Sequence, residues 1–286
     1  MIWLDGVLHE GPTVPWNAAD RGLLLADGLF ETMPAFGGRI FSLAEHLARL
    51  GGGARLLGFE APLARVEQGA LALARLAAGA PVVIRATVTR GVGPRGLRPP
   101  ADPAPTVMVT SAPFDPALVF QPTRLVTVGT RRNEHSPLSR VKSLAYMDNV
   151  LAIAEAREAG ADEALILNTA GRPVCASAAN VFVVHGTELV TPPVAEGVLP
   201  GVMRGRLISV ADRAGLVVTE RPLRPLDLAR AGEIFLTNSV RLVQPVTSID
   251  GVDLPEETPV ARRVLDLFRG LIDFETAATP DFGKRQ

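Results

Sequence analysis

Lysine is nearly absent from this chain of 286 residues. Only Lys142 and Lys284 occur, so arginine supplies 27 of the 29 basic residues. Arginine replaces lysine wherever a positive charge is enough, but its guanidinium stays protonated and cannot act as a nucleophilic amine. Lys284 lies in the polar tail 281–286, where a charge needs only solvent. Lys142 precedes a long apolar segment and is the candidate for Schiff-base chemistry with a carbonyl, a surface lysine at a helix start being the alternative.

Cysteine and long apolar runs are also scarce. The single Cys175 excludes an intrachain disulfide framework and a multi-cysteine metal site, so we expect no metal, and it agrees with a reducing cytoplasm. The apolar stretch 71–88 is interrupted by Arg75, Pro81 and Arg85, and we do not expect it to cross a membrane. The net charge is −1 and no basic face is evident, which argues against nucleic acid as a partner.

Hydrophobic residues make up 47% of the chain and charged residues 21%, which is typical of a globular protein. Apolar spacing predicts helices, and runs rich in β-branched residues predict strands. The predicted helices are 42–57, 63–78, 144–159 and 202–214. Ser42 and Glu45 would form a capping box at the start of the first, and Gly160 would end the third. The predicted strands are 2–7, 82–89, 106–110, 124–129, 163–168, 179–185, 216–220 and 233–237. Because helices and strands do not alternate regularly, we predict an α+β fold.

The chain is long enough to form two modest domains. Residues 113–122 contain three prolines whose spacing interrupts both helices and strands, and we predict that this segment links the domains. The predicted N-terminal domain is 1–112. The larger C-terminal domain is 123–286 and ends in a short polar tail.

A phosphate site is predicted at 199–204, where a Pro-Gly turn runs directly into a helix. The backbone amides of Val202 and Met203 would lack partners within the helix and would point at an anion, although any helix start offers this arrangement. The segment 237–239 follows a strand and could add a hydroxyl, with ordinary hydrogen bonding at a strand end as the alternative. Arg49 is either a surface arginine or a fixed charge for the phosphate.

Together these segments resemble the class IV aminotransferases, which are pyridoxal-phosphate enzymes of fold type IV. The family includes branched-chain and D-amino-acid aminotransferases and aminodeoxychorismate lyase. The resemblance extends over nearly the whole chain, and the order and spacing of its short motifs make it specific. The motifs lie at 20–22, 27–32, 46–50, 90–96, 141–149, 161–164, 178–182, 199–204 and 237–239.

The resemblance implies the cofactor pyridoxal 5'-phosphate and a role for each matching residue. Lys142 would hold the cofactor's aldehyde as a Schiff base, the internal aldimine. Tyr146 lies near the position that bonds the ring hydroxyl in the branched-chain enzymes, but one residue closer to the lysine. The implied phosphate ligands are Arg49, the amides of Val202 and Met203, and Ser239. The further implied cofactor-binding residues are Cys175, Asn180 and Leu199.

The chain departs from the family at Cys175. At this position, five residues before Asn180, relatives carry a glutamate that bonds the pyridine nitrogen and keeps it protonated. A neutral thiol is a weak donor and holds no charge near the ring. Three consequences remain open: another acid supplies the contact, the enzyme works with an unprotonated ring, or fast transamination has been lost. A thiol that only packs as a small buried side chain is compatible with all three.

Substrate recognition is expected on loops. In the D-amino-acid enzymes an arginine, with a histidine two residues later, holds the substrate carboxylate. Arg95 matches the arginine, whereas Leu97 replaces the histidine, and Phe30 replaces a tyrosine of the substrate pocket. The segment 93–96 is closer to the lyase, and Met203 to the lyase or the D-enzymes. We expect Arg95 to bind the substrate carboxylate, with an exposed loop charge as the alternative.

The resemblance therefore implies a two-domain α+β enzyme with its cofactor in the interdomain cleft. We predict transfer of an amino group between an amino acid, either branched-chain or D-, and a 2-oxo acid. One alternative is aminodeoxychorismate lyase chemistry, which releases pyruvate. Another is a family member that binds the cofactor with little turnover because of Cys175. We also expect a homodimer, a cytoplasmic location, and neither nucleic acid nor a membrane as a partner.

Overall fold

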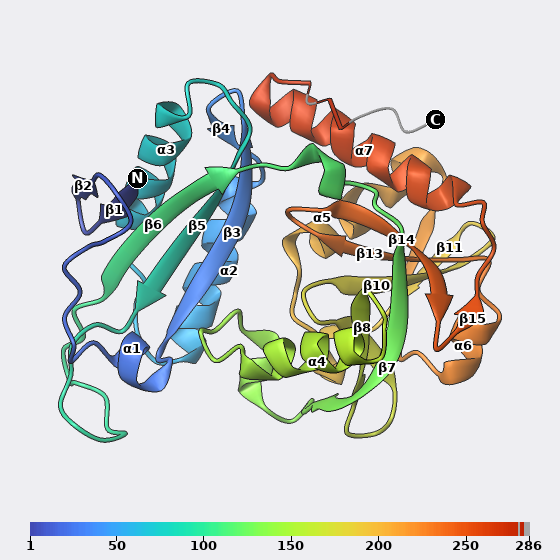
Figure 1. Cartoon of the computed structure of the whole chain (residues 1–286), viewed down its shortest axis with the longest axis horizontal. Coiled ribbons are helices and arrows are strands. Elements are labelled where there is room, and N and C mark those ends of the chain that lie inside the picture. Colours follow the sequence, from blue (N-terminus) through green and yellow to red (C-terminus); the bar gives the residue numbers. More distant parts are fainter. Residues whose placement is uncertain (280, 283–286) are drawn as a thin grey trace. The chain divides into compact units, whose positions relative to one another are not determined.

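The computed structural model describes residues 1–279 and 281–282, and Lys284 lies outside them. Contacts between residues divide the chain into two compact units (Figure 1). The first unit comprises residues 1–114, 141–145 and 272–279. The second comprises 115–140, 146–271 and the described residues after 280. The domain limits predicted from the sequence stay a prediction.

The first unit is built on a six-stranded antiparallel sheet in the order β2-β1-β6-β5-β3-β4. Its strands are β1 (Ile2–Leu4), β2 (Val7–His9), β3 (Gly28–Phe36), β4 (Arg39–Ile40), β5 (Val82–Thr89) and β6 (Thr106–Pro113). Its helices are α1 (Arg21–Leu25), α2 (Leu43–Leu56) and α3 (Leu63–Leu76). The central strands β3 and β5 pair without interruption, which makes β3 a rigid support for the residues it carries.

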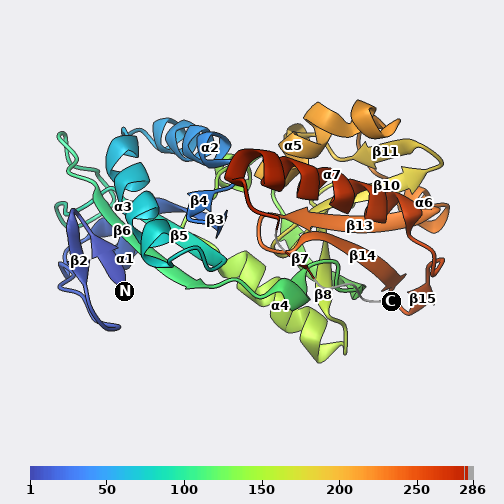
Figure 2. The same ribbon diagram turned by 90° about the horizontal axis from the view of Figure 1, so that it is seen from above.

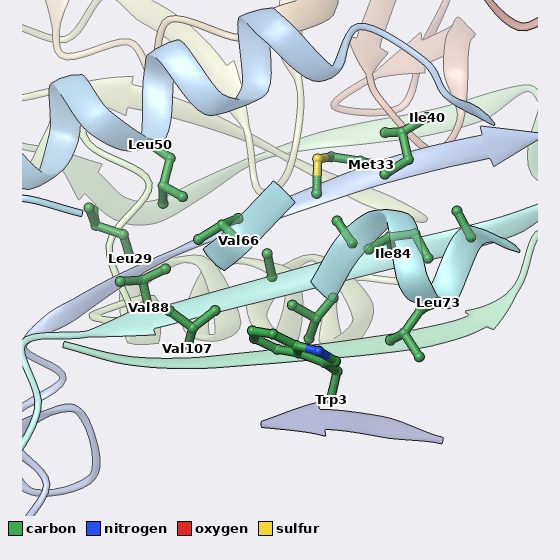
Figure 3. Close-up of a cluster of buried hydrophobic side chains, with 14 of the residues drawn as sticks. Trp3, Leu29, Met33, Ile40, Leu50, Val66, Leu73, Ile84, Val88 and Val107 are labelled. Carbon is green, nitrogen blue, oxygen red and sulfur yellow. The ribbon is translucent and has the colours of Figure 1, made fainter. Parts of the chain in front are cut away.

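Two amphipathic helices, α2 and α3, cover one face of this sheet (Figure 3). Met33 and Ile84 project from the strands and meet Leu50 of α2 and Leu73 of α3 in a buried apolar core. The approach of α3 is close, because a Cβ added at Gly69 would lie 2.6 Å from the indole ring of Trp3. The core thus fixes α2 above β3.

The second unit contains a mixed sheet whose path closes on itself. Its strand order is β12-β11-β10-β13-β14-β7-β8-β9, and β9 also pairs with β10, so the strands from β10 to β9 form a ring. Strand β7 pairs in parallel with both β8 and β14. The strands are β7 (Thr123–Arg132), β8 (Glu163–Asn168), β9 (Pro173–Ala176), β10 (Asn180–His185), β11 (Glu188–Thr191), β12 (Val217–Glu220), β13 (Glu233–Asn238), β14 (Leu242–Ile249) and β15 (Val252–Asp253).

The helices of the second unit surround this ring. They are α4 (Met147–Glu158), α5 (Val202–Val210), α6 (Pro225–Ala229) and α7 (Pro259–Thr276), of which the last residues are grouped with the first unit. Short 3-10 helices are η1 (Pro116–Leu118), η2 (Pro137–Arg140), η3 (Val194–Glu196) and η4 (Ala211–Ala214). The start of α7 lies against the start of β13 (Figure 2), where the amides of Val260 and Ala261 donate to the Glu233 carboxylate. No helix in the described part of the chain is long and apolar enough to span a membrane.

Most elements predicted from the sequence are found, some with different ends. Strands β5 and β8 have the predicted limits. The strand predicted at 106–110 continues to Pro113, and the helix predicted at 202–214 ends at Val210 and is followed by η4. The strand predicted at 2–7 is a hairpin of two short strands. Strands β3, β9 and β14 and helix α7 were not predicted.

The capping box predicted at the start of α2 is wrong. Ser42 has a left-handed φ of 54°, and its side chain makes no cap hydrogen bond. Its backbone N–H donates instead to the Glu275 carboxylate, 2.9 Å away. The first turn of α2 is therefore held by a residue far along the chain, which the local pattern of Ser42 and Glu45 cannot reveal.

The helix predicted at 144–159 begins only at Met147. The preceding residues are held beside β3, because the Phe30 N–H donates to the Lys142 carbonyl and the Leu144 N–H donates to the Gly28 carbonyl. These bonds keep the segment extended and prevent its first residues from joining the helix. The other end of the helix is as predicted, with Gly160 at a φ of 74°.

Candidate functional site

Lys142 is fixed in the first unit by the backbone that carries it. The Phe30 N–H donates to the Lys142 carbonyl over 3.0 Å, and a bridge joins Leu29 to Ser143. The ammonium nitrogen Nζ lies 4.1 Å from the centroid of the Phe30 ring, which is itself buried. The predicted nucleophile and the predicted pocket residue Phe30 are therefore in direct contact.

The surroundings of Lys142 favour a neutral amine. Burial, followed by the positive charge of Arg49, lowers the pKa of Lys142 to about 7. The negative charge of Glu31 raises the pKa of Lys142, whereas the positive charge of Arg85 lowers it. Arg85 lies over the same aromatic ring, with its Cζ atom 3.9 Å from the Phe30 centroid. Nucleophilic chemistry needs such a neutral amine.

A buried ionic network lies beside this lysine. Arg49 of α2 holds both carboxylate oxygens of Glu31 on β3, with Nε at 2.8 Å from Oε1 and Nη2 at 2.6 Å from Oε2. The ring nitrogen Nδ1 of His46 lies 2.7 Å from Glu31 Oε2. Burial alone would raise the pKa of Glu31, but the charge and hydrogen bonds of Arg49 outweigh it and lower the pKa to about 2. Burial lowers the pKa of His46 against the opposing effect of Glu31.

The loop that carries Arg95 is organised by another arginine. Arg21 donates from its guanidinium to the carbonyls of Gly96, Leu97 and Arg98, and its Nε donates to Asp27 at 2.8 Å. Leu97 is 83% exposed, and Arg95 is exposed without a hydrogen bond or ion pair to any described residue. The structure thus leaves the Arg95 guanidinium available to a ligand, and its substrate role stays a prediction.

In the second unit, the predicted phosphate segment forms a tight turn at the start of α5. The Asn180 side chain donates from Nδ2 to the Leu199 carbonyl over 3.0 Å. A Cβ at Gly201 would lie 1.9 Å from Oδ1 of the same side chain, so a larger residue there would have to displace Asn180. Gly201 is the N-cap of α5 and offers no side chain to the first amides, which include those of Val202 and Met203. Amides at this position can receive an anion.

A row of side chains crosses the sheet beside this turn. Cys175, Asn180 and Thr237 are paired in register on β9, β10 and β13, so their side chains share one face. The Thr237 hydroxyl is buried and has no hydrogen-bond partner among residues 1–279 and 281–282. Ser239 follows just beyond the end of β13 and is half-buried. An unsatisfied buried hydroxyl is costly, which makes Thr237 a candidate ligand for a bound group.

Cys175 forms the other end of the row, and Arg132 lies beside it. Nη2 of Arg132 lies 4.0 Å from the Cys175 sulfur, and the Arg132 Nε is buried without a partner in the described part of the chain. Burial raises the pKa of the Cys175 thiol, against the effect of Arg132, so the thiol stays neutral. Tyr146 is half-buried and acts electrostatically on Arg132.

The structure therefore gathers the predicted residues within each unit. Lys142, Phe30 and Arg49 lie together in the first, whereas Cys175, Asn180, Leu199, Val202 and Met203 surround the turn and the row in the second. Their roles stay predictions. Sequence reasoning gave no role to Glu31, His46 or Arg85, and it offered Thr237 only as part of the segment 237–239. Glu31, His46 and Thr237 lie inside the motifs 27–32, 46–50 and 237–239, which was the available signal.

Comparisons with known proteins agree with these motifs. The family model for class IV aminotransferases matches residues 28–249. The chain is 37% identical over 253 residues to a proposed branched-chain-amino-acid aminotransferase of Methanocaldococcus jannaschii, covering 87% of this chain and 88% of that protein. It is 27% identical over 282 residues to the D-alanine aminotransferase of Bacillus licheniformis, covering 97% of this chain and 99% of that protein. Its structure is similar to that of 4-amino-4-deoxychorismate lyase from Pseudomonas aeruginosa, with a TM-score of 0.85, 33% identity, and coverage of 96% and 100%.

Proposed function

Because the chain belongs to the class IV aminotransferase family, we propose that it transfers an amino group between an amino acid and a 2-oxo acid. The proposed donor is a branched-chain or a D-amino acid, which are the substrate classes named for similar proteins. The observation that carries the proposal is Lys142, an amine with a pKa of about 7 in a chain that otherwise uses arginine.

Membership of this family confirms the enzyme class and the cofactor, pyridoxal 5'-phosphate, that the motifs predicted. Similarity to solved structures of the family confirms the fold. One of these is the Escherichia coli branched-chain amino acid aminotransferase, which has a TM-score of 0.89 at 24% identity. The interdomain position of the cofactor stays a prediction.

The residues of each unit fit this cofactor. The Lys142 amine suits an aldehyde, and the start of α5 together with the unpartnered Thr237 hydroxyl suits a phosphate. Arg49 binds Glu31 through two hydrogen bonds, and its role as a phosphate ligand stays a prediction. At the position that relatives use for the pyridine nitrogen, Cys175 provides no carboxylate.

When bound, pyridoxal phosphate withdraws electrons from the α-carbon of an attached amino acid. We assign two tasks to Lys142: covalent attachment of the cofactor's aldehyde, and transfer of a proton at the substrate's α-carbon through Nζ. A lysine with a pKa of about 7 is about half neutral at pH 7, compared with about 0.03% for the ordinary value of 10.5. Contact with Phe30 and the backbone bond to β3 orient Nζ for both tasks.

The second candidate is a lyase that releases pyruvate from aminodeoxychorismate. Similarity to the Pseudomonas aeruginosa lyase supports it, with 33% identity over 96% of this chain. The third candidate is a protein that binds the cofactor with little turnover, and Cys175 supports it. All three share the cofactor and the lysine, so the reaction itself must separate them.

The deciding experiment mixes the cofactor-loaded enzyme with single L- and D-amino acids. An aminotransferase loses the visible band of its cofactor with a matching donor and regains it with a 2-oxo acid. A lyase releases pyruvate from aminodeoxychorismate without any 2-oxo acid. Borohydride should fix the cofactor to Lys142, and Lys142→Ala should abolish attachment while the chain stays folded, because only the amine is lost. Attachment at Lys284 would overturn the assignment of Lys142.

A further inference from the structure

Arg132 is a half-buried cation, and the exposed Asp148 carboxylate acts on it electrostatically. In residues 1–279 and 281–282 it forms no ion pair with a carboxylate, and its Nη2 lies 4.0 Å from the neutral Cys175 thiol. Its Nε is buried and bonded to nothing in the same part of the chain. A buried charged donor without a partner is costly, which indicates that a ligand supplies the missing acceptor.

A second unpartnered donor lies at the opposite end of the same row. Thr237 and Cys175 flank Asn180 on adjacent strands, so their Cα atoms are separated by two strand spacings, or about 10 Å. The Thr237 hydroxyl and the start of α5 form the end of the row that can receive an anion, and Arg132 lies at the other end. A ligand that fits this row therefore has a phosphate at one end and a hydrogen-bond acceptor at the other.

The cofactor has this pattern only when its pyridine nitrogen is unprotonated. A neutral pyridine nitrogen accepts a hydrogen bond, whereas a protonated one is a cation and a donor, and a guanidinium would repel it. A guanidinium cannot be deprotonated in a protein, so it can never accept the ring proton. A carboxylate at the position of Cys175 would instead hold that proton.

We propose that Arg132 donates a hydrogen bond from Nε to the pyridine nitrogen of the cofactor and keeps this nitrogen unprotonated. The inference rests on the proposed function, because it requires pyridoxal phosphate in the site. Arg132 is thus a cofactor-binding residue that replaces the acid of the relatives, and Cys175 leaves the space for it. The ring is then a weaker electron sink than in a relative that protonates it.

Glu163 is the buried acid that competes with this assignment. Its charge is felt at the Cys175 thiol. Its Oε1 already accepts hydrogen bonds from the backbone N–H groups of Ala164 and Ser177, at 2.8 and 3.1 Å. These bonds hold the carboxylate against the backbone, which favours Arg132 as the group that meets the ring.

The test is nitrogen NMR of the enzyme loaded with pyridoxal phosphate that carries ¹⁵N in the ring. In the wild-type chain we expect the resonance of an unprotonated pyridine. Cys175→Glu should move it to the position of a protonated pyridine, whereas the neutral control Cys175→Ser should not. Arg132→Met should shift the resonance because a hydrogen bond is lost, whereas the matched control Arg131→Met, on the same strand, should leave it unchanged.

The outcomes separate this inference from the proposed function. A wild-type chain without the cofactor's visible band contradicts the proposed function itself. A bound cofactor with a protonated ring nitrogen contradicts only the inference, and loss of that proton in Glu163→Gln would assign the contact to Glu163. An unmoved resonance in Arg132→Met, with a higher KM for carboxylate substrates, would assign Arg132 to the substrate instead.

Discussion

Replacement of Arg85 by methionine should raise the pKa of Lys142. Both charged groups lie about 4 Å from the centroid of the same Phe30 ring, so they are at most about 8 Å apart. At that distance two positive charges repel by about 2 kcal/mol at an effective dielectric constant of 20 and about 0.5 kcal/mol at that of water. Removal of the Arg85 charge should therefore raise the pKa of Lys142 by about 0.4–1.5 units. We expect a shift in the lower half of this range, because Arg85 is exposed and solvent screens its charge.

The near-absence of lysine makes this shift measurable. A chain labelled with ¹³C at the lysine side chains has only two such residues, and Lys284→Arg identifies the signal of Lys142. Titration of the cofactor-free protein then gives the pKa of Lys142 directly in the wild type and in Arg85→Met. Methionine keeps an unbranched side chain over the ring, so packing changes little. The matched control is Arg75→Met, at the end of α3, whose charge is not among those that act on Lys142.

Two results would refute this reasoning. A wild-type Lys142 that titrates near the ordinary value of 10.5 would show that burial and the neighbouring cations do not favour the neutral amine. A pKa near 7 that is the same in wild type and Arg85→Met would show that the Arg85 charge is screened by solvent, leaving burial and Arg49 as the causes.

Three further predictions follow from the site and the surface. Arg95→Leu should lower kcat/KM for amino-acid and 2-oxo-acid substrates roughly ten- to a hundred-fold without changing the cofactor band, and Arg95→Lys should restore part of it, because a charge-assisted bond to the carboxylate is lost. Glu31→Gln should destabilise the chain by about 3–5 kcal/mol in urea unfolding at neutral pH, because it removes the buried carboxylate charge that pairs with Arg49. The Glu31 pKa of about 2 lies below its ordinary 4.5, so its contribution is complete above about pH 4.5 and is lost as the pH falls towards 2; equal acid sensitivity in wild type and Glu31→Gln would contradict this. The exposed leucines of α1 suggest a contact surface, and we expect a homodimer that buries more than about 1,200 Å², so an active monomer in sedimentation at micromolar concentration would disprove it.

Sequence patterns predicted the elements whose signals are local. Helices α2 and α3 follow from apolar spacing, and β5 and β8 follow from runs of β-branched and aliphatic residues. Sequence patterns do not predict strand β3, because it is buried at nearly every position and lacks the alternation of a half-buried strand. It also carries the charged Glu31. Strand β14 contains Pro245, which argues against a central strand. Helix α7 has buried apolar residues at helical spacing, and this pattern is the local signal of the helix.

Local sequence patterns also fail to predict the contacts within the candidate site. Lys142 stands out in the sequence because lysine is rare, but Glu31 and Arg85 approach it only through the pairing of β3 with β5. The contact of Arg132 with Cys175 depends on an irregularity in the pairing of β7 with β8 just before Arg131. Across this irregularity the pairing advances by four residues on β7 and by two on β8, so the irregularity sets which residues of β7 lie beside the end of β8. No local pattern in the sequence reveals such a shift.

The electrostatic features of the two units bear in opposite directions on the proposed chemistry. In the first unit, burial and the positive charges favour a neutral Lys142, which is ready to accept a proton at neutral pH. In the second, the proposed bond from Arg132 makes the ring a weaker electron sink, so removal of the substrate's α-proton depends more strongly on the lysine. Cys175→Glu should therefore raise kcat while borohydride still attaches the cofactor to Lys142. A variant with unchanged kcat and a protonated ring would show that the electron sink does not limit the rate, and that Cys175 affects the state of the ring without governing turnover.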